Sequence, residues 1–149
     1  MNITLICIGK LKEKFWQDAA AEYIKRLGRF CDLKLVELAE SKSDDIAEES
    51  ENIIRHLPKG SYVVALDVGG KRFSSEGFAE KISAVQLGGA SHIAFVIGGS
   101  NGYSDAVRAK ADLRLSFSDF TFPHQLMRVV LLEQIYRAFK INAGEKYHK

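Results

Sequence analysis

The stretch Ile93-Ala94-Phe95-Val96-Ile97-Gly98-Gly99-Ser100-Asn101-Gly102-Tyr103 joins five apolar residues to a turn with three glycines. An apolar run of this length, bounded by turn residues, is typical of a strand buried on both faces. Ser104-Asp105 then resembles a helix start, so the glycines lie at the carboxyl end of a strand. Open α/β sheets bind ligands at that end, and glycines let a ligand approach bare amides. The stretch predicts a binding turn, with a plain strand-to-helix connection as the alternative.

Strand-like and helix-like segments alternate outward from this stretch along the whole chain. Apolar or alternating runs predict strands at residues 3–8, 33–38, 62–66, 93–97 and 113–117. Apolar spacing and caps predict helices at residues 15–27, 44–56, 74–87, from 104 onward, and 123–141. In the first helix, Phe15, Ala19, Tyr23 and Leu27 are expected to form the buried face. The alternation predicts an α/β fold, a parallel sheet with helices on both faces, in a single domain of residues 1–149.

Composition restricts the class of protein. The chain has 149 residues, 46% of them apolar, which suits one domain with its own core. Its apolar runs are too short to cross a bilayer and its start lacks a basic leader, so we expect a cytoplasmic protein with no membrane contact. The two cysteines offer no disulfide framework, and the four histidines lack metal-ligand spacing. No metal is predicted.

The charges are unevenly distributed along the chain. Net charge is +2, but residues 41–60 carry three basic and five acidic groups, whereas residues 123–149 carry five basic and two acidic. The basic carboxyl-terminal end is predicted to face a partner, and ordinary solvated charge on a terminal helix is the alternative.

The last predicted helix is apolar on more than one side. Pro123 is expected at its first position, where a missing amide costs nothing. Leu126, Met127, Val129 and Val130 leave little polar surface in its first turns. A helix apolar nearly all round is buried, which predicts that a second subunit covers it.

Sequence motifs bear on two other enzyme classes, the dinucleotide-binding enzymes and the serine hydrolases. A dinucleotide-binding fold needs Gly-x-Gly-x-x-Gly after the first strand, but that strand ends in the single Gly9, so the class is disfavoured. Residues 98–102 satisfy Gly-x-Ser-x-Gly, with Asp119 and then His124 or His148 in hydrolase order. A nucleophile elbow starts its helix directly after the serine, whereas a glycine, a tyrosine and a new cap intervene here, which weakens the serine hydrolase hypothesis.

Several segments together resemble a known family. They are Phe95-Val96-Ile97-Gly98-Gly99-Ser100-Asn101-Gly102, Leu115-Ser116-Phe117-Ser118, Thr121-Phe122-Pro123-His124-Gln125-Leu126-Met127-Arg128-Val129, Glu133-Gln134-Ile135-Tyr136-Arg137-Ala138 and Tyr147-His148-Lys149. With these segments the chain resembles the RlmH-type ribosomal RNA methyltransferases of the SPOUT superfamily, over residues 3–149 and without departure at a motif position.

The resemblance implies a fold and an activity that periodicity alone does not show. The implied fold is an α/β domain with a C-terminal trefoil knot, assembled as a homodimer. The implied activity is transfer of a methyl group from S-adenosylmethionine to N3 of a pseudouridine in the 23S rRNA of the assembled 70S ribosome. A ribosome-associated domain that binds the cofactor without turnover is the non-enzymatic alternative.

The resemblance also assigns site residues. Cofactor contacts are expected from Leu66, Gly98, Phe117, Ser118, Asp119, Phe120, Thr121 and Phe122. For Phe120 and Phe122, simple core packing is the alternative. Gly98 is expected to have positive φ and to leave space for the cofactor.

Catalytic candidates lie in the last helix and the tail. They are His124, Glu133, Arg137, Tyr147 and His148, and candidate phosphate contacts are Arg128, Arg137, Lys140, Lys146 and Lys149. His124 as a helix cap and Glu133 as a partner of Arg137 are the structural alternatives. The tail of residues 145–149 is expected to complete the active site of the other subunit.

Overall fold

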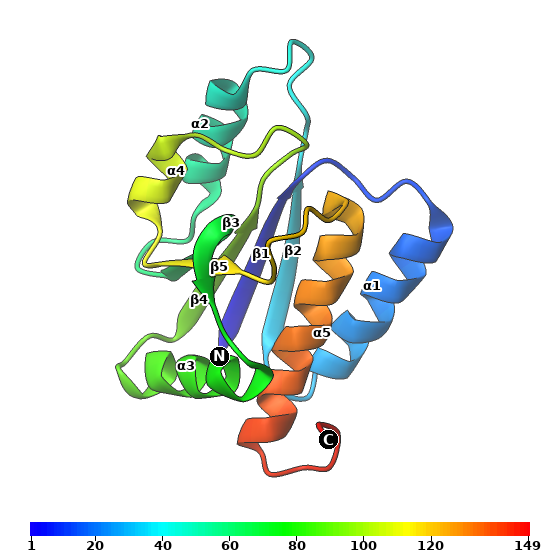
Figure 1. Cartoon of the computed structure of the whole chain (residues 1–149), viewed down its shortest axis with the longest axis vertical. Coiled ribbons are helices and arrows are strands. Elements are labelled where there is room, and N and C mark those ends of the chain that lie inside the picture. The colour runs from blue at the N-terminus through cyan, green and yellow to red at the C-terminus, as the bar shows by residue number, and fades with distance from the viewer.

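The computed structural model describes all residues 1–149, with strands and helices alternating along the chain (Figure 1). The strands are β1 Asn2–Ile8, β2 Asp32–Leu38, β3 Tyr62–Arg72, β4 His92–Ile97 and β5 Leu113–Ser116. The helices are α1 Lys14–Leu27, α2 Ile46–His56, α3 Ser75–Leu87, α4 Asp105–Lys110 and α5 His124–Asn142. The predicted order of elements is confirmed.

All strand pairs of the sheet are parallel, in the order β2-β1-β4-β3-β5. β1 and β4, both predicted as strands from their apolar runs, pair in register from Asn2↔His92 to Cys7↔Ile97 at the centre of the sheet. Their side chains are almost wholly buried because helices cover both faces. The predicted parallel α/β sheet is confirmed.

Helices form a layer on each face of the sheet. α1, α3 and α5 share one core with Leu5 and Phe95, while α2 and α4 share the other with Ile6 and Val96. Neighbouring residues of one strand thus enter opposite cores, as the period of two requires. None of the helices combines the length and the hydropathy needed to span a membrane.

Helix ends and faces correct the sequence prediction in two places. Pro123 has φ −55° and ψ 137°, an extended conformation, so it precedes α5 as the N-cap rather than starting it. Phe15 was expected on the buried face of α1 but is 63% exposed, while Ala20 and Leu27 are buried. The buried face of α1 is rotated because the helix packs against α5 rather than lying flat over the sheet.

β3 continues beyond its predicted end and curls over β5 (Figure 1). Leu115 pairs first with Leu66 and then with Lys71, with the intervening residues looped out between these pairings. A Cβ at Gly70 would lie 2.6 Å from the carbonyl of Arg114, so only glycine permits this crossing. β5 itself therefore lies directly against this turn of β3. The predicted trefoil knot is compatible with this crossing and stays a prediction.

Arg128 of α5 is 1% exposed and ties the helix to the sheet. Its Nη1 donates to Glu37 Oε2 at 2.6 Å and its Nη2 to the Gly9 carbonyl at 3.1 Å, while Nε is buried without a partner. A guanidinium enclosed in this way cannot meet a phosphate. The prediction of Arg128 as a phosphate contact is wrong, because the sequence does not reveal that Glu37 lies opposite.

Candidate active site

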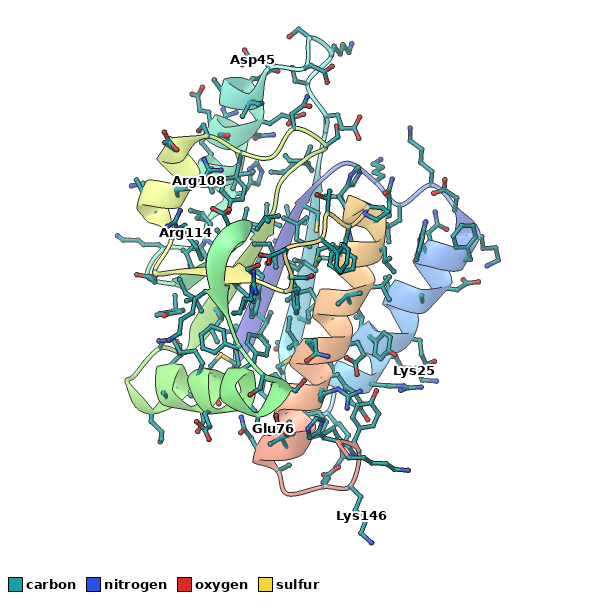
Figure 2. The ribbon with its side chains drawn as sticks, viewed as in Figure 1. Lys25, Asp45, Glu76, Arg108, Arg114 and Lys146 are labelled. Carbon is teal, nitrogen blue, oxygen red and sulfur yellow. The ribbon has the colours of Figure 1, made fainter.

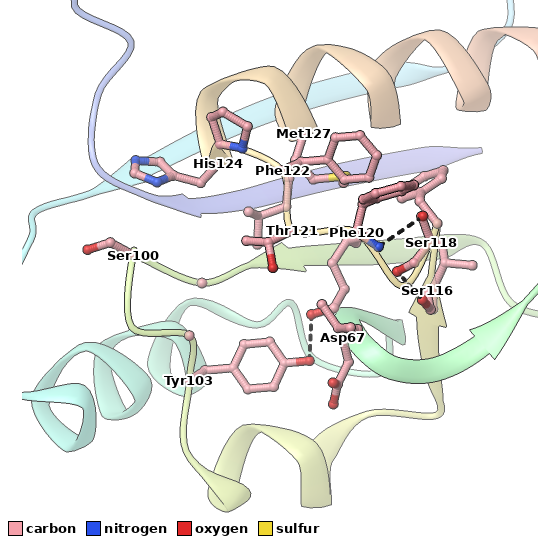
Figure 3. Close-up of a pocket in the computed structure, with 18 of the residues that line it drawn as sticks. Asp67, Ser100, Tyr103, Ser116, Ser118, Phe120, Thr121, Phe122, His124 and Met127 are labelled. Carbon is pink, nitrogen blue, oxygen red and sulfur yellow. Dashed lines mark hydrogen bonds between the residues drawn. The ribbon is translucent and has the colours of Figure 1, made fainter.

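A cleft of about 570 Å³ opens at the carboxyl ends of β3, β4 and β5 (Figure 3). This size is within the usual range for small-molecule sites. Three backbone segments enclose it: the end of β3, the glycine turn, and the loop between β5 and α5. Seven of the predicted cofactor residues line it, namely Leu66, Gly98, Phe117, Ser118, Phe120, Thr121 and Phe122. The structure thus gathers residues from distant parts of the chain around one space.

The glycine turn folds back on itself. Gly102 N–H donates to the Gly99 carbonyl at 2.9 Å, and Gly102 has φ +80°. Gly98 does not have positive φ; instead, a Cβ there would lie 2.8 Å from the Gly102 carbonyl. The expectation of positive φ at Gly98 is therefore wrong, whereas its role in leaving space for the cofactor stays a prediction. Glycine is needed there so that the turn can close, and a larger residue would disturb the turn before it met a ligand.

Tyr103 forms one wall of the cleft and was missed by the sequence analysis. Its hydroxyl donates to the Leu66 carbonyl at 2.7 Å, which links the glycine turn to the end of β3. Burial, and secondarily the nearby Asp67 carboxylate, raise the pKa of Tyr103 far above its usual range, so its hydroxyl remains a donor. The only sequence signal was an aromatic residue directly after the glycine turn.

Asp67 brings a negative charge to the same wall. Burial opposes its ionisation, but the Gly69 N–H at 3.0 Å and Arg108 Nε at 3.1 Å outweigh burial and lower its pKa. Arg114 lies 3.6 Å from the same carboxylate. Figure 2 shows Arg108 and Arg114 on the same side of the molecule, on α4 and β5. The cleft therefore has one ionised carboxylate among mostly apolar walls.

The loop of residues 117–122 is held by its own side chains. Ser118 Oγ accepts the Phe120 N–H at 3.0 Å, and Ser116 Oγ donates to the Ser118 carbonyl at 3.2 Å. Phe120 is 79% exposed at the cleft, which excludes the core-packing alternative for this residue. Asp119 lies outside the cleft lining and pairs with Arg72 of β3.

His124 and Ser100 both line the cleft but are not arranged as a hydrolase. No hydrogen bond joins their side chains in Figure 3, and Asp119 is engaged by Arg72. α4 begins at Asp105, several residues after the serine, so Ser100 is not on a nucleophile elbow. These contacts argue against the serine hydrolase alternative.

The other four catalytic candidates gather along the second half of α5 and the tail, in a group that we call the C-terminal cluster: Glu133, Arg137, Tyr147 and His148. Arg137 Nη2 lies 2.5 Å from Glu133 Oε1, and Tyr147 donates to the same oxygen at 3.2 Å. His148 contacts Arg137 at 3.1 Å and Glu76 of α3 at 2.7 Å. At 1.5 Å per residue, Arg137 is roughly 20 Å along α5 from His124. Within one chain, the cluster is remote from the cleft.

Charges in the C-terminal cluster satisfy one another. Glu133 accepts from Arg137, Tyr147 and Gln134, and it holds the pKa of Arg137 above its usual value. Burial and the Glu133 carboxylate raise the pKa of Tyr147 to about 12. The pairing of Glu133 with Arg137, considered as a structural alternative, is present.

The basic carboxyl-terminal end is largely neutralised inside the chain. Lys140 pairs with Glu145 at 2.5 Å, and Glu145 also pairs with Arg29. Lys146 points away from the molecule in Figure 2, and Lys149 is also exposed. The predicted partner-facing surface is reduced to these two lysines. No group of three His, Cys, Asp or Glu side chains is placed to hold a metal ion.

A parallel α/β sheet with a cleft built from backbone turns at its carboxyl edge is typical of proteins that bind a small molecule such as a cofactor. Residues 1–148 match the family described as predicted SPOUT methyltransferase, and the chain belongs to that family. Enzymes of this family transfer methyl groups, with S-adenosylmethionine as donor. The family resemblance in the sequence is confirmed.

Relatives are similar over their whole length. A ribosomal RNA large subunit methyltransferase H from Clostridium novyi is 55% identical, and one from Bifidobacterium adolescentis is 54% identical, with full coverage of both chains in each pair. A probable methylase family protein from Haemophilus influenzae Rd KW20 has a TM-score of 0.59 at 18% identity, covering 99% of this chain and 70% of that chain. This last likeness concerns the fold alone.

Proposed function

We propose that this chain transfers the methyl group of S-adenosylmethionine to N3 of a pseudouridine in the 23S rRNA of assembled 70S ribosomes. It acts as a single-domain cytoplasmic protein that forms a homodimer. The identity of 54–55% over full length with proteins named ribosomal RNA large subunit methyltransferase H carries the proposal. The cleft supports it, because its size and lining suit such a cofactor.

The cleft residues fit S-adenosylmethionine by chemistry. Leu115, Phe117, Phe122 and Met127 offer the apolar walls that adenine needs, and the backbone of the 117–122 loop offers hydrogen-bonding groups. Asp67 keeps an ionised carboxylate beside the cleft, but Arg108 and Arg114 balance its charge, so it is suited to accept from a hydroxyl-bearing part of the ligand. The cofactor, when bound, supplies an electrophilic methyl carbon on a sulfonium.

The chain's own residues must orient the target base and accept its N3 proton. Tyr147, with its pKa raised to about 12, stays neutral at physiological pH and acts as a donor or a stacking surface rather than a base. Glu133 is engaged by three donors, so it orients Arg137 and Tyr147. The proton acceptor is then His124 at the cleft, or His148 in the tail after it has released Arg137 and Glu76.

A dimer would bring the tail to a cleft. The C-terminal cluster lies at the opposite end of α5 from its own cleft, so it serves a neighbouring subunit in this proposal. The first turns of α5 keep half-buried apolar side chains available for the contact, namely Leu126, Met127, Val129 and Val130. Sedimentation that shows a stable monomer at micromolar concentration would contradict the dimer.

Calorimetry and ribosome methylation test the proposal together. We expect S-adenosylmethionine to bind the wild type, and Thr121→Trp to weaken binding because the indole fills the cleft that Thr121 lines. Ser43→Trp, at an exposed serine before α2, is the matched control. The wild type should incorporate methyl groups into 70S ribosomes from a strain that lacks the modification. Cofactor binding without incorporation would support a non-enzymatic binding domain instead.

A further inference from the structure

The segment Lys10-Leu11-Lys12-Glu13-Lys14-Phe15-Trp16, which we call the 10–16 strip, has an exposed aromatic side chain among lysines. Phe15 is 63% exposed, and its ring lies against that of Trp16 with centroids 4.9 Å apart. An exposed phenylalanine that is supported from one side has its other face free for a planar ligand. Three lysines against one glutamate make the strip basic.

The strip lies at the same edge of the sheet as the cleft. β1 pairs with β4 up to Cys7↔Ile97, so the chain leaves β1 beside the start of the glycine turn. Figure 1 shows the loop between β1 and α1 at the end of the molecule where α5 begins, and His124 of that helix end lines the cleft. A polymer whose target nucleotide enters the cleft would therefore reach the strip.

The loop that carries the strip is held rigidly. The buried Leu11 donates its N–H to Glu37 Oε2 at 3.1 Å and accepts from Gln17 Nε2 at 2.7 Å. The same Glu37 oxygen binds Arg128, which also holds the Gly9 carbonyl. A loop fixed in advance loses little conformational entropy on binding, which favours affinity.

Two lysines of the strip are available for a ligand. Lys14 pairs with Asp18 at 3.1 Å, whereas Lys10 and Lys12 are exposed and belong to no ion pair of the structure. Unpaired ammonium groups beside a stacking platform suit single-stranded nucleic acid, which offers phosphates and unstacked bases together. A purely apolar protein contact would use Phe15 but leave both lysines without a role.

We propose that the 10–16 strip binds single-stranded rRNA next to the target nucleotide, with Phe15 stacked on an unpaired base and Lys10 and Lys12 on phosphates. This inference rests on the proposed ribosomal RNA substrate. It places part of the RNA-binding surface on α1 and its preceding loop, away from the basic carboxyl-terminal residues that the sequence favoured.

Variants of Phe15 test the stacking. Phe15→Ala should raise the KM for 70S ribosomes by about tenfold or more, as loss of a base–aromatic stack does, with S-adenosylmethionine affinity unchanged. Phe15→Tyr should restore the KM, whereas Phe15→Leu should not, because leucine has no aromatic face. Leu87→Ala is the matched control: Leu87 is 86% exposed at the end of α3, at the opposite edge of the sheet, and its loss should change nothing.

Variants of the lysines test the phosphate contacts. Lys10→Ala and Lys12→Ala should each weaken ribosome binding. Each should also reduce the slope of the logarithm of the binding constant against the logarithm of salt concentration by roughly 0.7. Lys59→Ala, at an exposed lysine in the turn before β3, is the control and should leave that slope unchanged. Equal slopes for all three variants would refute the phosphate contacts.

The outcomes separate this inference from the function beneath it. Wild-type protein that methylates no ribosomal RNA would overturn the proposed function. If the wild type methylates ribosomes and Phe15→Ala has an unchanged KM, only the RNA-binding role of the 10–16 strip is refuted. Sedimentation distinguishes loss of RNA contact from loss of the dimer. If Phe15→Ala is monomeric while Phe15→Leu is again dimeric, Phe15 is a subunit contact, and this result also refutes the RNA surface.

Discussion

The cleft and the C-terminal cluster are built in opposite ways, although α5 contributes to both. The cleft is enclosed by backbone turns and leaves an open space with few polar groups. In the cluster, Glu133, Arg137, Tyr147 and His148 bind one another and Glu76. The cleft can bind a ligand without rearrangement, whereas the side chains of the cluster must break contacts with one another before they can contact a substrate.

In the proposed dimer, this difference separates the part of the site that one subunit would complete alone from the part that would need its neighbour. The cleft should bind the cofactor in any folded chain. The cluster has its charges paired and stands at the far end of a helix from the cleft. Changes at the cluster should therefore affect methyl transfer far more than cofactor binding.

Deletion of residues 147–149 should have the largest effect. Loss of Tyr147 and His148 removes a donor and a titratable ring from the proposed active site, so methyl transfer to 70S ribosomes should fall by about a thousandfold or more. The fold, the dimer and the affinity for S-adenosylmethionine should remain. A calorimetric loss of cofactor affinity in the deletion would show that the two regions are not separate.

Mixed dimers sharpen this result. A tail-deleted subunit paired with a Thr121→Trp subunit contains one composite site with both defects and one with neither, if the tail acts on the neighbour. We expect about half of the wild-type activity, by counting of intact sites. An inactive mixed dimer would place the tail in its own subunit's site.

Arg128→Ala should destabilise the cleft end of α5 strongly. Removal of a buried partner leaves Glu37 and the Gly9 carbonyl without their donor, so the free energy of unfolding should fall by about 3 kcal/mol. Arg137→Ala in the cluster is the comparison: its side chain is 24% exposed, so the loss should be about 1 kcal/mol or less. Urea denaturation measures both, and equal losses would contradict the contrast.

Tyr103→Phe should affect only cofactor binding in the cleft, and its effect should be smaller than those of the preceding variants. It removes the donor to the Leu66 carbonyl, so the wall between the glycine turn and β3 loosens. Affinity for S-adenosylmethionine should fall by up to about tenfold, as for the loss of one hydrogen bond. Tyr62→Phe, on the opposite end of β3, should leave calorimetric affinity unchanged.

Acid should release the tail with a small effect on stability. The hydrogen bond with His148 lowers the pKa of Glu76, and contacts with Lys140 and Arg29 lower that of Glu145. Because both pKa values are lowered in the folded state, these contacts are fully present above the usual carboxylate pKa of about 4.3 and are lost as pH falls below it. Nuclear magnetic resonance signals of Tyr147 should shift over that range in the wild type and less in Glu76→Gln. Tail signals that stay constant during acid titration until the protein unfolds would contradict the anchoring.

Local patterns were enough to predict the alternation of elements and the place of the glycine turn. The apolar runs of β1 and β4 identify central strands because burial on both faces demands apolar residues at every position. Asp45 caps α2 through the N–H groups of Ala47 and Glu48, close to the predicted start of this helix. These features depend on neighbours in sequence, so the sequence reports them directly. The motif resemblance added residues that the structure then places around one cleft.

Only the tertiary structure decided how distant segments meet. The sequence determined that Gly98 and Gly70 are glycines, but the close approach of Gly102 and of Arg114 supplies the reason for each. It likewise contained Arg128 without showing that this side chain would be buried and paired with Glu37. Exposure and pairing depend on which elements pack together across the sheet, and that is a property of contacts between residues far apart in the chain, which no local pattern encodes.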